Sequence, residues 1–178
     1  MKHKTSQKFP TWLIILGVIG AFLFIVVPLV VFFLIKPVQI VGKAMEPGYR
    51  LGEYYLTDRQ AYLFATPKRS DVVVYRYNFD GKNVLIISRV IGLPGDRIET
   101  KNGVVWINGQ KFDEPYLEAN TKTTIAGQDF NRILSDQEYF VLGDNREHSM
   151  DSRKNGPIKQ SDIKGKVTTR YWPIERVE

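Results

Sequence analysis

The sequence has no cysteine, and its only two histidines, His3 and His148, lie far apart along the chain. Neither a disulfide framework nor a thiolate metal site can therefore form. Two distant histidines also make a histidine-based metal site improbable, so we expect no metal and no cofactor. The lack of cysteine is compatible with a location outside the cytoplasm but does not require one.

Acidic residues are missing from the first 45 positions, and Glu46 is the first. Lys2, Lys4 and Lys8 alone supply half of the formal net charge of +6. The remaining chain is close to charge balance, which is typical of an ordinary protein surface and not of a nucleic-acid footprint. We therefore expect no nucleic-acid partner. The length of 178 residues allows one folded domain and an anchor.

Charge is also absent from residues 12–35, which read WLIILGVIGAFLFIVVPLVVFFLI. At about 1.5 Å per residue, such a helix reaches roughly 36 Å and crosses a hydrocarbon core of about 30 Å with some tilt. A cleaved signal peptide is the alternative. The run is too long for one, and Lys36, Pro37 and Val38 follow it in place of a cleavage site of small residues. The pattern predicts a retained transmembrane helix.

The lysines flanking this segment predict its orientation. Three precede it within ten residues, whereas only Lys36 and Lys43 follow closely. The excess of positive charge on cytoplasmic flanks predicts a cytoplasmic N-terminus at residues 1–11. Residues 36–178 then form an extracellular domain of a single-pass protein of the cell membrane.

Beyond the anchor, short runs rich in Val, Ile, Tyr, Phe and Thr alternate with Gly, Asn, Asp and Pro, which predicts strands and turns. Asn102-Gly103 and Asn108-Gly109 are strong hairpin signals, since both residue types accept positive φ. The fold class is thus a mostly β, antiparallel domain behind one helix. The expected strands are 37–42, 54–58, 71–78, 84–92, 96–103, 104–109, 137–143 and 165–174.

Two stretches depart from this pattern. Residues 59–66 predict a short helix, and no other stretch after the anchor holds a helical period. Residues 118–131 (EANTKTTIAGQDFN) are polar and predict an exposed loop, whose role in partner binding the sequence leaves open.

Five stretches carry a resemblance to a known family. They are VGKAMEPGYRLGE at 41–53, ISRVIGLPGDRIE at 87–99, INGQKFDEPYL at 107–117, GDNREHSMDSRKNGPI at 143–158 and IKGKV at 163–167. In this order they resemble the motifs of type I signal peptidases, from the anchor to near the end of the chain. The 143–158 stretch is the most specific of them.

The resemblance implies a membrane-anchored serine protease that removes signal peptides from exported proteins. It also implies two antiparallel β-sheet regions with an apolar face on the membrane. Catalysis in the family uses a Ser/Lys dyad without histidine or metal. A serine hydroxyl attacks only when a base takes its proton, and lysine serves as that base when burial lowers its pKa.

Both dyad positions are lost in this sequence. Ala44 stands where the resemblance places the nucleophilic serine, and Ser88 stands where it places the lysine. Gly48 replaces a threonine that usually follows the proline. The remaining motif residues match, and the resemblance implies that they line the peptide cleft or brace the site, with Asp151 and Arg153 paired and Ser149 beside the lysine position. They are Met45, Pro47, Arg89, Ser149, Asp151 and Arg153.

Other interpretations of these positions compete. Ser88 would be a replacement nucleophile only with a base, and Lys82 and Lys43 are poorly placed by spacing. Ala44 would also arise if a nucleophile had been replaced by design, although the further departures at Gly48 and Ser88 fit a natural pseudoenzyme better. Gly92, Gly95 and Gly143 suit positive φ or tight turns, so the motifs could persist for structural reasons alone.

The residues thus favour a catalytically inactive, signal peptidase-like membrane protein. It resembles the degenerate members found in Gram-positive pilus gene clusters, which implies an accessory role in pilus assembly. The partners implied are pilin or other exported precursors, or a sortase. The alternatives are an active signal peptidase with noncanonical residues, or an engineered nucleophile-to-alanine variant of one. A surface-binding module using Trp106, Tyr171 and Trp172 is a further alternative, although aromatic strand residues usually belong to the core.

Overall fold

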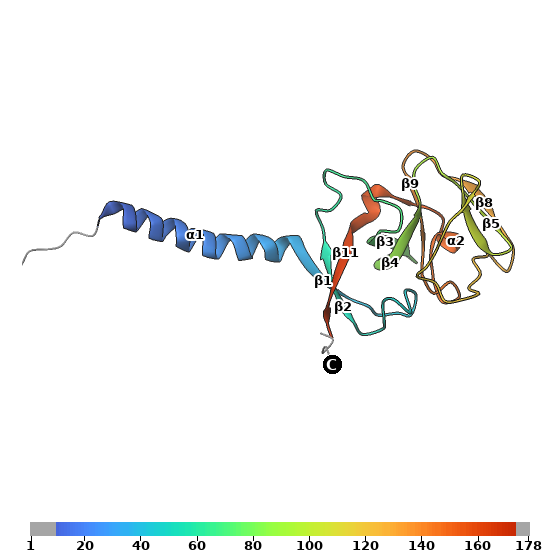
Figure 1. The fold of residues 1–178 in the computed structure, drawn as a ribbon, viewed down its shortest axis with the longest axis horizontal. Helices are drawn as coiled ribbons and strands as arrows, with labels where there is room; N and C mark the ends of the chain where they lie inside the picture. The colour runs from blue at the N-terminus through green and yellow to red at the C-terminus, as the bar shows by residue number, and fades with distance from the viewer. Residues whose placement is uncertain (1–9, 174–178) are drawn as a thin grey trace, which may run out of the picture. The chain divides into compact units, whose positions relative to one another are not determined.

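A computed structural model describes residues 10–173 of the chain, which divides into two compact units at Ile35 and Lys36. The first unit is the helix α1, Thr11–Leu34, with Pro28 inside it (Figure 1). Its stretch Thr11–Val30 is long and apolar enough to cross a membrane. Residues 1–9, which make up most of the predicted cytoplasmic segment 1–11, lie outside the described part.

The second unit is built from two antiparallel sheets, which confirms the expected fold class. The larger sheet has the order β1-β2-β11-β3-β4-β9-β10, and the smaller has the order β7-β6-β5-β8. Figure 1 shows β5 and β8 at one end of this unit, with β9 between them and β11. The strands are β1 Ile35–Gln39, β2 Tyr54–Asp58, β3 Val72–Phe79, β4 Lys82–Gly92, β5 Arg97–Lys101, β6 Val104–Ile107, β7 Gln110–Lys111, β8 Asn131–Ile133, β9 Glu138–Leu142, β10 Ile158–Lys159 and β11 Ile163–Trp172.

Both Asn-Gly pairs form the predicted hairpin turns in the smaller sheet. Asn102 and Gly103 have φ of 55° and 78°, and Asn108 and Gly109 have φ of 51° and 80°. Positive φ at both central residues matches the twist of the flanking strands. β5 therefore pairs with β6, and β6 with β7, through two-residue turns.

The predicted short helix at 59–66 is wrong, because this stretch forms turns. The Asp58 carboxylate accepts from the Gln60 N–H at 2.8 Å, and Tyr62 donates to Asp71 at 2.8 Å. The Asp58 bond is a local side-chain bond to the backbone, which competes with helix formation, and the Tyr62 bond ties the stretch to a residue nine positions on. The predicted strands did not include β8, β10 or the two-residue β7, although the hairpin signal at Asn108-Gly109 points to a strand at β7. The one-turn helix α2, Ser152–Asn155, was not predicted either.

The polar stretch 118–131 is irregular until β8 begins at Asn131, apart from one bridge between Ile125 and Gln128. It is not fully exposed as expected, because Thr123 is only 1% exposed. The Thr123 N–H donates to the Gly103 carbonyl at 2.8 Å, so this loop is fastened to the β5–β6 turn.

Three apolar clusters hold the two sheets. One packs the smaller sheet against the ends of β4 and β9 through Ile98, Ile91 and Phe140. The other two cover opposite faces of the larger sheet, with Met45, Val72 and Val74 on one face and Val73, Val90 and Val141 on the other. Residues that alternate along β3 and β4 thus point to two buried layers.

Of the three motif glycines Gly92, Gly95 and Gly143, two are required because neighbouring side chains pack closely against their Cα atoms, and only one has a positive φ. Gly95 has φ of 81°, as expected. At Gly92 and Gly143 φ is not positive, but a Cβ would meet Leu134 at 2.6 Å and Ser149 at 2.2 Å respectively. Backbone packing therefore requires glycine at both positions.

Asp96 fastens the turn between the two sheets. Its carboxylate accepts from the Leu93 N–H at 2.7 Å, the Asn108 side chain at 2.8 Å and Arg69 Nη1 at 2.9 Å. Burial raises the pKa of this carboxyl, but these donors outweigh burial and hold the pKa below its usual value.

Asp96→Asn should therefore destabilise the protein in a pH-dependent way. A depressed folded-state pKa gives stabilisation that is complete above the unfolded value of about 3.9 and is lost as pH falls through the folded value. We expect a loss of ~1–3 kcal/mol in the free energy of unfolding at neutral pH. In urea titrations this loss should shrink below about pH 4. The exposed Asp136→Asn is the control, and a loss that is constant with pH would contradict the assignment.

Candidate functional site

β4 has an open edge along more than half of its length. It pairs with β3 from Arg89 to Lys82 but with β9 only from Arg89 to Gly92. Along 82–88, no strand pairs with the side of β4 that faces away from β3 within the described residues. An unpaired strand edge offers a row of backbone donors and acceptors to an extended peptide.

An apolar groove of about 290 Å³ lies along this open edge. One wall is β4, and the opposite wall is the chain segment that leads from β1 to the first motif. Together the edge and the groove suit strand addition, in which main-chain bonds hold a peptide and pockets receive its side chains. The apolar groove is lined by Val38, Gln39, Ile40, Val41, Gly42, Ala44, Met45, Leu85, Ile86 and Ile87.

Ala44 lies in the wall of the apolar groove, and two contacts hold it there. The side chain of the next residue, Met45, is 2% exposed and packs with Val72 and Val74. The carbonyl of Ala44 accepts from the Asn145 N–H at 3.0 Å. Ala44 presents only a methyl group, which cannot attack a peptide bond.

Ser88 and Ser149 are brought together at Gly143. Arg89 pairs with Leu142, so the antiparallel register continues with Ser88 opposite Gly143. A Cβ on Gly143 would lie 2.2 Å from Ser149 Oγ and 2.6 Å from the Ala44 carbonyl oxygen. The absence of this Cβ leaves the space that Ser149 fills. Ala44, Ser88 and Ser149, far apart in sequence, therefore meet around one glycine.

Neither serine has a base in the part of the chain that the structure describes. The hydroxyls of Ser88 and Ser149 are buried without a hydrogen-bond partner. Lys82 begins β4, six residues and therefore roughly 20 Å from Ser88. Lys43 is exposed and does not line the apolar groove.

Tyr75 is the phenol that faces Ser88, without reaching hydrogen-bond geometry. Burial raises the pKa of Tyr75 to about 12, so it stays protonated at neutral pH. A protonated phenol cannot accept the proton of a serine hydroxyl. Tyr75 therefore does not serve as a base for Ser88.

Asp151 holds the backbone on which the site is built. Its carboxylate accepts from the Gly143 N–H at 3.0 Å and from Arg153 Nη2 at 2.8 Å. It also caps α2 through the Arg153 N–H. Asp151 is 0% exposed, and a buried charge needs a partner. Among the described residues, Arg153 is its one ion-pair partner.

Two more arginines brace the segment that follows Gly143. Arg89 binds Asp144, with Nε at 2.8 Å from Oδ1, and stacks 4.0 Å over the ring of Tyr116. Arg146 donates to the Gly143 carbonyl at 3.1 Å and pairs with Glu114 at 3.2 Å. The motif residues thus fix the backbone from both sides.

Most of the predicted site residues fall into two groups in the structure, one at the apolar groove and one in the network that braces Gly143. Met45 lines the apolar groove, whereas Arg89, Asp151 and Arg153 lie in the bracing network. Pro47 is exposed and does not line the groove. The prediction missed the groove walls at 38–41 and 85–87. A signal for the wall at 85–87 was present in the sequence. Val84–Ile87 are four apolar residues in succession, whereas a strand with one buried face alternates apolar and polar residues.

A β domain with an apolar groove along an open strand edge, preceded in sequence by one apolar helix, has the architecture that the resemblance to signal peptidases implies. The family model described as signal peptidase, peptidase S26, matches residues 12–172. Signal peptidase IB of Staphylococcus aureus is 37% identical, covering 95% of this chain and 92% of the relative. Signal peptidase I of Bacillus caldolyticus is 32% identical, covering 98% and 95%.

A crystal structure of a signal peptidase I from Enterococcus faecalis is also similar, with 31% identity and a TM-score of 0.49 over 58% of this chain and 97% of that one. By the family model and the curated relatives, the chain belongs to the signal peptidase family, peptidase family S26. The match to the family model extends through the apolar helix and both sheets.

Gly143→Ala should destabilise the site, because its Cβ would overlap Ser149 Oγ and the Ala44 carbonyl. We expect a loss of ~1–3 kcal/mol in the free energy of unfolding, measured by urea denaturation. Gly42→Ala is the matched control, since nothing lies within 4 Å of its Cβ position. Equal stability of the two variants would show that Ser149 and the Ala44 carbonyl do not crowd Gly143.

Proposed function

We propose that the chain is a catalytically inactive member of the signal peptidase family that binds exported precursor proteins. One observation carries this proposal: the apolar groove leads to Ala44, and the hydroxyls of Ser88 and Ser149 have no base among the described residues. Loss of a nucleophile and its base costs on the order of 10⁶ in turnover. The encounter of such a groove with a peptide ends in reversible binding.

The partner class follows from the resemblance to degenerate signal peptidases of Gram-positive pilus gene clusters. Both dyad positions are changed, and a single apolar helix precedes the domain. These two features support an accessory, chaperone-like role in pilus assembly at the cell surface. Its partners would be pilin or other exported precursors, and a sortase.

The proposed placement is a single-pass anchor in the cell membrane, with residues 12–35 as the span. It rests on the apolar helix and on the lysines before it. Protease added to intact spheroplasts should therefore degrade the domain at 36–178 and spare an N-terminal tag. Degradation of the tag with survival of the domain would reverse the orientation.

A second candidate function is signal peptide removal by noncanonical residues, because the relatives that match almost the whole chain are named signal peptidases. It requires a hydroxyl at the apolar groove that is activated without the usual lysine. An engineered change at Ala44 belongs with this candidate, since it would mask an active scaffold.

Cleavage of a pilin precursor that bears a signal peptide separates these functions. The purified full chain in detergent is compared with the double variant Ala44→Ser and Ser88→Lys. We expect no product from the native chain above a no-enzyme control, and cleavage by the double variant, because the scaffold around Gly143 is intact. Circular dichroism checks folding of the variant, since Ser88 is 0% exposed.

Product formation by the native chain would overturn the proposal. Cleavage by Ala44→Ser alone would show that the nucleophile position is the only loss and that another group serves as base. If the double variant is folded and does not cleave the precursor, the apolar groove itself has diverged from a substrate site.

A further inference from the structure

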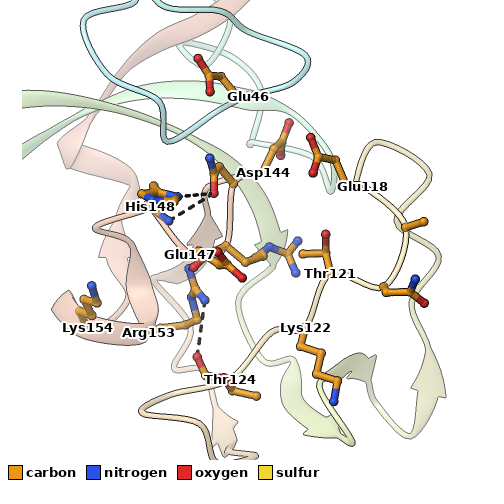
Figure 2. A pocket seen from close by; sticks show the side chains of 14 residues that line it. Glu46, Glu118, Thr121, Lys122, Thr124, Asp144, Glu147, His148, Arg153 and Lys154 are labelled. Carbon is orange, nitrogen blue, oxygen red and sulfur yellow. Dashed lines mark hydrogen bonds between the residues drawn. The ribbon is translucent and has the colours of Figure 1, made fainter.

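The motif at 107–117 contributes no residue to the apolar groove. It contributes none either to the polar hollow of about 610 Å³ that has Asp144 in its wall (Figure 2). Two of its side chains, Glu114 and Tyr116, nevertheless contact two arginines that brace the segment after Gly143. The motif therefore reaches the site through arginine side chains.

Glu114 binds Arg146 through both of its carboxylate oxygens. Oε2 accepts from Nη1 at 3.2 Å, and Oε1 accepts from Nη2. The Arg146 side chain is 0% exposed, and Glu114 is its one ion-pair partner among the described residues. A two-point ion pair fixes the position and the orientation of a guanidinium, and a buried guanidinium without a carboxylate is costly. Glu114 therefore determines where Arg146 lies.

Arg146 passes this constraint to the backbone. Its Nε donates to the Gly143 carbonyl at 3.1 Å. Two residues later, the Asn145 N–H donates to the Ala44 carbonyl at 3.0 Å. Ala44 lies in the wall of the apolar groove. The Glu114 carboxylate is therefore connected to that wall by hydrogen bonds and one short stretch of backbone.

Tyr116 adds a second contact between the motif and the same backbone segment. Its hydroxyl donates to Glu114 Oε1 at 2.7 Å, and the Arg89 guanidinium carbon lies 4.0 Å from the centre of its ring. Burial and the nearby Glu114 charge raise the pKa of Tyr116, so the hydroxyl keeps the proton that it donates. Arg89 in turn holds Asp144, the residue after Gly143. Both contacts of the motif thus involve Glu114.

We infer that Glu114 is a positioning residue of the apolar groove: it holds Arg146 and, through Arg146, the backbone at 143–145 against Ala44. This inference rests on the proposed peptide binding. The assigned role needs neither a nucleophile nor a base, so it operates in the chain as it stands. Glu114 should therefore affect how tightly a peptide is held.

Hydrogen exchange and peptide binding test this role with the full chain in detergent micelles. Glu114→Gln keeps the side-chain shape and removes the charge, whereas Glu114→Asp keeps the charge. The probe is a fluorescent synthetic peptide of alanine, valine and leucine with terminal lysines, and its Kd is measured by fluorescence polarisation. Exchange of the Asn145 N–H is followed by mass spectrometry.

Asp71→Asn is the matched control. Asp71 also pairs with a cation, Lys166 at 2.6 Å, and accepts from a tyrosine, Tyr62 at 2.8 Å. It lines neither the apolar groove nor the polar hollow. A loss of overall stability alone would therefore appear in this variant as well.

We expect Glu114→Gln to raise the exchange rate of the Asn145 N–H and the Kd of the peptide at least about fivefold each, because the buried Arg146 loses a charge-assisted bond. Glu114→Asp should recover part of both effects, and Asp71→Asn should change neither. An unchanged Kd in folded Glu114→Gln would overturn the inference. An equal rise of the Kd in Asp71→Asn would overturn it too, since the effect would then be one of overall stability.

Circular dichroism checks the folding of each variant. If Glu114→Gln does not fold, Glu114→Asp takes its place in both measurements, with a smaller change in the same direction expected. Absence of peptide binding by the native chain would overturn the proposed function. Exchange of the Asn145 N–H would then still decide whether Glu114 positions the backbone, and an unchanged rate would contradict it.

Discussion

The hydrogen bond from the Gly143 N–H to the Asp151 carboxylate is the interaction on which the site depends. From Gly143 the chain runs directly into Asp144 and Asn145, which position Arg89 and the Ala44 carbonyl. The same carboxylate begins α2 and holds Arg153. A fully buried carboxylate is costly unless every lone pair is occupied, and here backbone N–H groups and a guanidinium occupy them. The geometry is therefore rigid without any contribution from a catalytic side chain.

The network that braces the site does not include the two positions where the resemblance places the dyad. At position 44, exchanging a serine for alanine would remove one hydroxyl from a half-buried wall. At position 88, exchanging a lysine for serine would remove a charge from a fully buried position and relieve a desolvation cost. Neither exchange would touch the network of Asp151, Arg153 and Arg146. Under the proposed function, the site would therefore stay formed after both exchanges.

The fold was largely predictable because its signals are local. Asn-Gly pairs set two hairpins, and the β-branched runs of β3 and β4 have the composition of buried strands. The motifs predicted Ala44, Ser88 and Ser149 as neighbours in one site, and the structure places them around Gly143. The groove walls and the short strands were not predictable, because the open edge of β4 depends on where a distant strand, β9, stops pairing. The turn at 59–66 was mispredicted because the Asp58 bond to the Gln60 N–H and the Tyr62 bond to the Asp71 carboxylate outweighed its weak helical pattern.

The open edge of β4 also bears on solubility. An unpaired, apolar strand edge normally invites a second copy to pair with it and extend the sheet. Here the segment from Val38 to Met45 lies across the apolar groove from Leu85, Ile86 and Ile87, which form the middle of that edge. The wall therefore stands where a second copy would have to approach in order to pair with these residues. The same segment that forms the apolar groove thus also shields part of the open edge from edge-to-edge association.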